Sequence, residues 1–203
     1  MLFVSDRDVY DSCPSDWLWV YDKLIIARRQ GIRAAPAGIP VPESREYVVR
    51  PITNIRMMGR GARRVWIQAG DDEPVPDGYF WSEVLEGSHV SVDYHWGEQA
   101  LTVEGFRDNP DRLDRFSRWC KIDRDMPLPK ILHGLEDHLE WINVEYIGDR
   151  VIEVHLRLND DFANHDAEEI WPVWPETLRT QPENMQWYAS AAGERLGFWI
   201  KNK

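Results

Sequence analysis

An acidic residue, a histidine and an arginine stand two apart in VIEVHLRL, residues 151–158, and form the clearest chemical pattern in this chain. Strand alternation would place Glu153, His155 and Arg157 on one face of a sheet. The apolar residues between them would face the core; they are Ile152, Val154 and Leu156. An arginine on the polar face would hold an anion. A solvated sheet face with alternating charges is the simpler interpretation of the same pattern.

Glu145, on the preceding strand-like stretch, could add a second carboxylate to this face. A connection of three residues, 148–150, would place Glu145 opposite Glu153 on one face, whereas a two-residue loop would place them on opposite faces. Adjacent carboxylates repel each other unless a cation joins them, and their oxygens are ligands that Mg²⁺ prefers. The pattern therefore indicates a magnesium site if the two residues share a face.

Glycines and arginines gather in RPITNIRMMGRGARRV, residues 50–65, although the chain as a whole is acidic. Gly59 and Gly61 would let the backbone approach a ligand closely. The arginines that follow Arg50 in this stretch are Arg56, Arg60, Arg63 and Arg64. A loop with backbone N–H groups and guanidinium groups suits phosphates, but it matches neither the P-loop spacing nor the dinucleotide fingerprint. An exposed hairpin tip remains the alternative.

A third row of polar residues occurs in HVSVDYHW, residues 89–96, where His89, Ser91, Asp93 and His95 alternate with apolar residues. The two histidines lack a third zinc ligand at a recognisable spacing, and no nucleophile elbow supports a hydrolase. We therefore expect this row to be a solvent-facing side of a strand.

The elements that must position these residues are mostly strands. Apolar periodicity predicts helices over 17–30, 110–121 and 131–139. Strands are expected over 46–50, 65–69, 79–85, 89–96, 100–106, 141–147 and 151–158. This mixture of antiparallel-looking strands and a few helices indicates an α+β fold, with two subdomains separated near the turn at 71–78.

Composition excludes several classes of protein. The 203 residues include 11 Trp, 7 Tyr and 6 Phe, too many aromatic residues for a disordered chain. No run approaches the ~20 apolar residues of a membrane span, and the N-terminus has acids where a signal peptide needs basic residues, so we expect a cytoplasmic protein. A net charge of −11 argues against a nucleic-acid partner. Cys13 and Cys120 are expected to be ordinary thiols.

Taken in order, the segments resemble the ATP-grasp superfamily over about residues 20–160. The matching motifs are YDK at 21–23 followed by GIPVP at 38–42, EYVVRP at 46–51, MMGRGARRV at 57–65, YFWSEVLEGSHVSVDY at 79–94 and INVEYIGDRVIEVHLR at 142–157. The resemblance implies two subdomains built from antiparallel sheets with flanking helices, and a nucleotide between them. The expected divisions are a short N-terminal segment (1–20), an N-terminal subdomain with the glycine loop (21–80), a C-terminal subdomain with the metal site (81–170) and a Trp/Pro-rich tail (171–203).

The resemblance also implies roles in binding ATP. Lys23 and Arg50 would contact the phosphates, although Arg50 stands where the family has a lysine. Gly59, Arg60 and Gly61 would belong to the glycine loop over the phosphates. The backbone of Glu83, Val84 and Leu85 would meet adenine, and the side chain of Glu86 or His89 would reach the ribose.

For the metal, the resemblance implies Glu145 and Glu153 as carboxylate ligands of Mg²⁺, with Arg157 near the transferred phosphate. His155 stands where the family has an asparagine ligand, and imidazole nitrogen matches Mg²⁺ poorly.

The activity implied is that of an ATP-dependent ligase that joins a carboxylate to an amine, or less readily to a thiol, through an acyl phosphate. Its partners would be small-molecule or peptide substrates, without a membrane, and a second copy of the chain could complete the substrate side. The alternative is an ATP-binding regulatory or complex subunit with reduced catalysis, indicated by Arg50 and His155.

Overall fold

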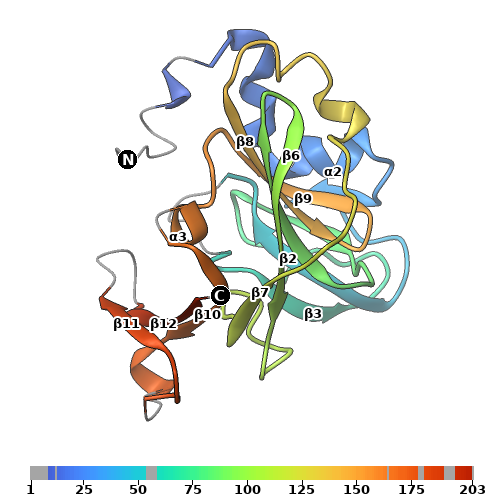
Figure 1. The fold of residues 1–203 in the computed structure, drawn as a ribbon. Helices are drawn as coiled ribbons and strands as arrows, with labels where there is room; N and C mark the ends of the chain where they lie inside the picture. The colour runs from blue at the N-terminus through green and yellow to red at the C-terminus, as the bar shows by residue number, and fades with distance from the viewer. Residues whose placement is uncertain are drawn as a thin grey trace.

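Two antiparallel sheets form the molecule in the computed structural model, which describes residues 9–11, 13–53, 59–163, 165–177, 181–189 and 195–202 (Figure 1). The smaller sheet has the order β1 (Ala34–Pro36), β4 (Tyr79–Glu83), β2 (Arg45–Pro51), β3 (Arg63–Ile67). The larger sheet has the order β11 (Gln186–Ala189), β12 (Gly197–Asn202), β10 (Ala167–Val173), β7 (Arg118–Lys121), β6 (Glu98–Phe106), β5 (His89–His95), β8 (Trp141–Ile147), β9 (Arg150–His155). The predicted α+β class is confirmed.

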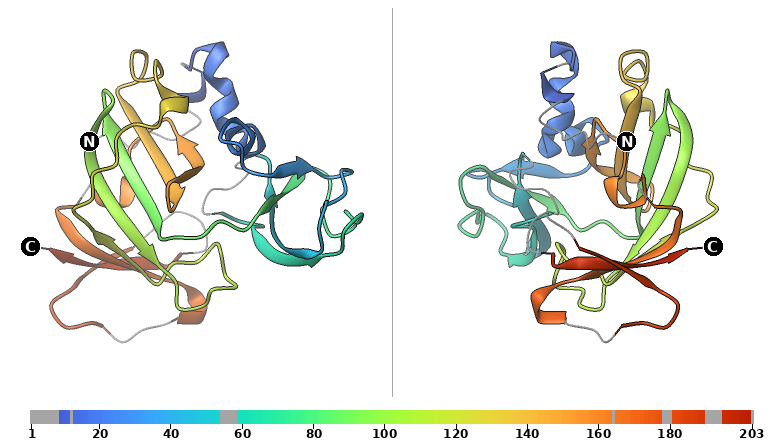
Figure 2. Two further views of the ribbon diagram at one scale, coloured as in Figure 1. Left: turned by 90° about the vertical axis from the view of Figure 1, so that its right-hand side faces the viewer. Right: turned by 60° about the vertical axis from the view of Figure 1, so that its left-hand side comes forward.

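The two sheets stand beside each other, joined by the segment between β4 and β5 (Figure 2). The C-terminal strands extend the larger sheet, because β10 pairs with β7 through Glu169–Cys120 and Ile170–Trp119. The subdomain boundaries drawn from the sequence stay a prediction. Among the described residues, no helix is long and apolar enough to cross a membrane.

Helices are few and short. They are η1 (Ser15–Tyr21), α2 (Lys23–Arg29), η2 (Lys130–Leu132), α3 (Asp160–Ala163) and η3 (Pro175–Thr177). The single helix predicted over 17–30 is wrong, because the chain breaks at Asp22. That residue has an extended backbone and caps α2 by accepting a hydrogen bond from Ile25 N at 2.8 Å.

The break at Asp22 fixes the start of α2 against the end of β2. Asp22 forms a β-bridge with Thr53, and Lys23 N donates to Ile52 O at 2.9 Å. At the other end of α2, Gln30 Nε2 donates to Val151 O at 2.7 Å and Gln30 Oε1 accepts from Val151 N at 2.8 Å. Helix α2 is therefore tied both to the smaller sheet and to β9, the edge strand of the larger sheet.

The predicted helices over 110–121 and 131–139 are also wrong. Over 110–121 the chain turns and then pairs as β7 with β6, while Phe116 packs over Gly105, where an added Cβ would lie 2.6 Å from the ring. In the second segment only η2 forms, because Gly134 takes a left-handed φ of 97° and its N–H donates to Glu136 Oε2. Apolar spacing alone did not account for these tertiary contacts.

The main core lies on one side of β5, β8 and β9, against η1, α2 and the segment 122–139. Its most deeply buried members on the strands are Val90, Val92, Tyr94, Ile142 and Val144. Tyr94 Oη and Tyr146 Oη bond to each other at 2.8 Å within this core, which satisfies both hydroxyls. The opposite side of the same three strands carries the polar rows.

The β8–β9 hairpin decides whether the two acidic residues share a face. Its loop has two residues, because Ile147 pairs with Arg150, and that register alone would separate Glu145 from Glu153. A bulge at Ile152 shifts the register by one, so Glu145 lies directly opposite Glu153. The predicted shared face is present, but through a bulge rather than a three-residue loop. Ile152 is buried outside the main core, and Val151 enters the core instead.

Gly148, in the hairpin loop, touches the segment that joins the two sheets. Its φ is 61°, and a Cβ there would lie 2.7 Å from Glu86 O. We expect Gly148→Ala to lower the free energy of unfolding by more than ~2 kcal/mol, since strain of ~1–2 kcal/mol adds to the clash. Urea unfolding measures this. The matched control is Gly38→Ala, with φ of 85° and nothing within 4 Å, and equal losses in the two variants would refute the predicted contact.

Candidate functional site

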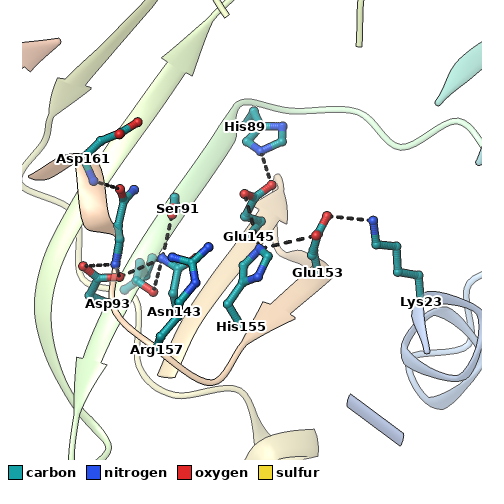
Figure 3. A network of polar contacts seen from close by, with 12 residues as sticks. Lys23, His89, Ser91, Asp93, Asn143, Glu145, Glu153, His155, Arg157 and Asp161 are labelled. Carbon is teal, nitrogen blue, oxygen red and sulfur yellow. Dashed lines mark hydrogen bonds and ion pairs between the residues drawn. The ribbon is translucent and has the colours of Figure 1, made fainter. Parts of the chain in front are cut away.

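The polar side of β5, β8 and β9 (Figure 3) is largely buried, so the expectation of a solvent-facing row on 89–96 is wrong for His89, Ser91 and Asp93, whereas His95 is exposed as expected. The buried polar residues of this face are His89, Ser91, Asp93, Asn143, Glu153, His155 and Arg157. Glu145 is partly exposed among them, with 25% of its side chain accessible. Alternation was predicted correctly, but alternation does not say which face is covered.

Lys23 and His155 both contact Glu153 (Figure 3). Lys23 Nζ, from the first turn of α2, lies 3.0 Å from Glu153 Oε2, and both side chains are less than 10% exposed. His155 Nε2 lies 3.3 Å from Glu153 Oε1 and 4.0 Å from Glu145 Oε1. The structure therefore brings together Lys23, Glu145, Glu153 and His155, which the sequence placed in one site.

His89 is held between Glu145 and an arginine that sequence reasoning missed. Arg107 Nη2 donates to His89 Nδ1 at 3.1 Å, so His89 Nε2 is the atom that donates to Glu145 Oε2, at 3.0 Å. Burial lowers the pKa of Arg107 to about 10, against the raising effect of Glu145 and Asp114. The position of Arg107 directly after the predicted strand 100–106 was the one feature of the sequence that could have pointed to its role. His89 is therefore engaged by both Arg107 and Glu145, and the ribose role implied for it stays a prediction.

Glu145 is ionised over a wide pH range. Burial by itself would raise its pKa, but the hydrogen bond from His89 and the electrostatic influence of His89, His155 and Lys23 outweigh burial and hold the pKa at about 2. The face therefore keeps a carboxylate at Glu145 that is neutralised by basic neighbours.

Asp93 forms the second part of the polar face. Asn143 Nδ2 donates to Asp93 Oδ1 at 2.7 Å and to Ser91 Oγ at 2.8 Å, and Asn159 N donates to Asp93 Oδ1 at 2.9 Å. These bonds fasten the chain after β9 to β5. Arg157, expected near the transferred phosphate, lies at this end of the face in Figure 3, where Nη1 donates to Leu158 O at 2.9 Å.

Arg50 belongs to the smaller sheet and is close enough to the acidic pair to be influenced by its charge. It is half-buried on β2, and its guanidinium carbon lies 5.1 Å from the centre of the Phe80 ring. Burial lowers its pKa, while the charges of Glu153 and Glu145 act in the opposite direction. Within the described part of the chain it has no ion-pair partner, and its buried Nε has no hydrogen-bond partner. Arg50 is thus a cation beside the carboxylates with its charge unpaired.

The glycine loop between β2 and β3 approaches the larger sheet. An added Cβ on Gly59 would lie 3.8 Å from Leu113 O, the oxygen that accepts from Arg107 Nη2 at 3.0 Å. Gly61 packs against the Tyr79 hydroxyl, and Arg60 is half-buried beside it. Arg56, the first arginine expected in this loop, lies outside the described residues. Arg107 therefore connects the two regions: it donates to Leu113 O, which lies next to Gly59, and to His89, which is bonded to Glu145.

The segment expected to meet adenine connects the two sheets. Glu83 N donates to Arg33 O at 2.9 Å. The Glu83 carboxylate accepts from Arg33 N and pairs with Arg45, so the described contacts of Glu83 lie within the smaller sheet and its connections. Leu85 packs on the cluster that contains Phe80, next to Arg50, and Val84 is half-buried. Glu86 is exposed.

A cavity of about 580 Å³ opens beside Glu153. Its polar lining comes from Asp11, Asp22, Lys23, Thr53, Glu153 and His155, and its apolar lining comes mainly from Leu18 and Val20 of η1. This volume suits a small organic molecule.

Comparison with solved structures decides the fold. The chain is similar to an ATP-grasp superfamily protein from Archaeoglobus fulgidus, with a TM-score of 0.52, 14% identity, and coverage of 91% of this chain and 64% of that one. It is also similar to an L-amino acid ligase from Bacillus licheniformis, with a TM-score of 0.55, 10% identity, and coverage of 90% and 66%. The chain has an ATP-grasp-like fold.

This ATP-grasp-like chain spans slightly less than two thirds of the length of each of those two proteins. No protein-family model matches the sequence, and no curated protein matches it. At identities of 10% and 14% the likeness concerns the fold alone.

The magnesium ion that an ATP-grasp fold implies does not fit the residues present. Among the described residues, no three His, Cys, Asp or Glu side chains are arranged to hold a metal ion. The Lys23 ammonium lies 3.0 Å from Glu153 Oε2 and already supplies a cation to that carboxylate. His155, between the two acids, offers a nitrogen, which is a poor ligand for Mg²⁺.

Proposed function

We propose that the chain is an ATP-dependent ligase that joins a carboxylate to an amine, with a thiol as the less favoured acceptor. One observation carries the proposal: Lys23, held at the end of β2, pairs with the buried Glu153 at 3.0 Å, and Arg50 on β2 lies close enough to feel the charges of Glu153 and Glu145. Buried cations beside a cavity suit the phosphates of a nucleotide. The similarity in fold to an L-amino acid ligase supports small carboxylates and amines as the substrate class.

The proposed reaction has two steps. A carboxylate oxygen of the first substrate attacks the γ-phosphorus of ATP, the bond to the β,γ-bridging oxygen breaks, and an acyl phosphate and ADP result. The amine of the second substrate then attacks the acyl carbon, loses a proton, and displaces inorganic phosphate as the amide forms.

The residues of this chain would act by position and charge. Lys23 and Arg50 would neutralise the negative charge that spreads over the phosphoryl oxygens during transfer. The loop that contains Gly59 and Gly61 would cover the phosphates and exclude water, which would otherwise hydrolyse the acyl phosphate. Arg157 is proposed near the transferred phosphate, and Leu85 near the adenine.

Three measurements test the proposal. ATP at about 100 times its dissociation constant should stabilise the chain by about 2.7 kcal/mol, visible as a rise in Tm. ADP release should require a carboxylate from a mixed panel of amino acids and short peptides. Arg50→Met removes a charge that has no ion pair among the described residues, and it should weaken ATP binding by at least about tenfold. Wild-type affinity in that variant, with the fold intact by circular dichroism, would contradict the assigned site.

A second candidate is a nucleotide-binding subunit without ligase activity. Two features favour it: Glu145 and Glu153 are engaged with basic side chains, and His155 stands where the ATP-grasp resemblance implies an asparagine metal ligand. ATP binding without ADP formation across the panel would select this candidate.

A further inference from the structure

The two carboxylates at the centre of the face are already matched with basic groups. Glu153 contacts Lys23 at 3.0 Å and His155 at 3.3 Å, and Glu145 accepts a hydrogen bond from His89 at 3.0 Å. His89 is in turn fixed by Arg107 at 3.1 Å. Removing one partner of such a buried pair leaves the other charge uncompensated, so each acid has a structural reason to keep its basic neighbour.

Arg50 adds positive charge that the described residues do not pair. It feels the charges of both Glu145 and Glu153, yet it forms no ion pair with either in the described part of the chain. Asp93 is held by Asn143 and the Asn159 N–H at the other end of the face, and Asp114 pairs with Arg112 and Arg115. Among the described residues, Arg50 is therefore a positive charge near the two glutamates without an ion pair, which calls for an anion.

We infer that this face binds the polyphosphate of its nucleotide directly through Lys23 and Arg50, without a magnesium ion held by Glu145 and Glu153. The inference rests on the proposed function and deepens it. The two glutamates act as counter-ions that position Lys23, His89 and His155. Arg50 supplies a charge that no residue in the described part of the chain pairs, and its planar guanidinium can donate two hydrogen bonds to one phosphate group.

The test measures binding to the full chain with excess EDTA and, in parallel, with excess Mg²⁺. The probes are ATP, ADP and inorganic tripolyphosphate. Their binding is measured by thermal shift and by titration calorimetry. We expect ATP and ADP to bind in EDTA, with dissociation constants that change less than about threefold when Mg²⁺ is added. Mg²⁺ alone should leave the Tm unchanged.

Variants assign the binding to the named residues. Arg50→Met should weaken ATP binding in EDTA by at least about tenfold, whereas the control Arg118→Met, on a half-exposed arginine that faces Glu169, should leave it unchanged. Competition of tripolyphosphate with ATP on the wild-type chain tests the same site without any substitution.

Each outcome has a meaning. If ATP binds with Mg²⁺ but at least about tenfold more weakly in EDTA, or if Mg²⁺ alone stabilises the wild type but not Glu153→Gln, the inference is overturned and the proposed function stands. If tripolyphosphate binds in EDTA and nucleotides do not, the anion site stands and the proposed function falls. If no probe binds under either condition, both fail.

Discussion

Glu153→Leu is expected to lower the free energy of unfolding by about 3–5 kcal/mol, because it leaves the Lys23 ammonium buried without its carboxylate. The two side chains are 5% and 8% exposed and 3.0 Å apart, so water cannot replace the lost partner without opening the structure. His155 loses the same carboxylate. Urea unfolding of the wild type and the variant measures the difference.

Two controls make this prediction specific. The double variant Lys23→Met/Glu153→Leu replaces both charges by apolar groups and should recover most of the loss, as a double-mutant cycle would show. Glu46→Leu breaks the exposed pair with Arg64, at 3.2 Å, and should cost less than about 1 kcal/mol. If Glu153→Leu lowers the free energy of unfolding no more than Glu46→Leu does, the buried ion pair between Lys23 and Glu153 does not stabilise the fold as predicted.

Acid should destabilise the chain through Glu145. Its pKa is about 2 in the folded chain and 4.5 as an ordinary carboxyl, so the ionised form favours the folded state. This contribution is complete above about pH 4.5 and is lost as the pH falls toward about 2. Its full size is on the order of 3 kcal/mol.

Glu145→Gln isolates that contribution. The amide can still accept a hydrogen bond from His89 but does not titrate, so its free energy of unfolding should fall less steeply than that of the wild type below about pH 4.5. Other lowered carboxyls, such as Asp114, titrate in both proteins and cancel in the difference. If the free energy of unfolding falls equally steeply with pH in the two proteins, the loss of stability in acid does not come from Glu145.

Local patterns in the sequence were enough to predict most strands and the α+β class. Alternation in HVSVDYHW and VIEVHLRL placed the polar and apolar sides of β5 and β9 correctly up to the bulge, because side chains alternate strictly in a regular strand. The order of short motifs was enough for the resemblance to an ATP-grasp fold, which the structural comparison confirms. The roles of Lys23, Arg50 and Glu145 within the fold stay predictions.

The helices could not be predicted from spacing alone. Apolar residues at helical intervals between 110 and 121 instead pack over Gly105 and form β7, since contacts with a distant strand outweigh local periodicity. Asp22 breaks the first helix through a bridge to Thr53, a residue 31 positions away in sequence. Propensity describes the isolated segment, and these partners lie outside it.

The sequence by itself determined which residues carry charge and which strands alternate. Tertiary structure decided three further points: the bulge at Ile152 that turns Glu145 and Glu153 to the same face, the burial of the row from His89 to Asp93, and the arrival of Arg107 behind His89. The physical reason is common to all three. Register, burial and the pairing of charges depend on segments that meet only when both sheets and α2 have packed, so a local pattern carries no information about them.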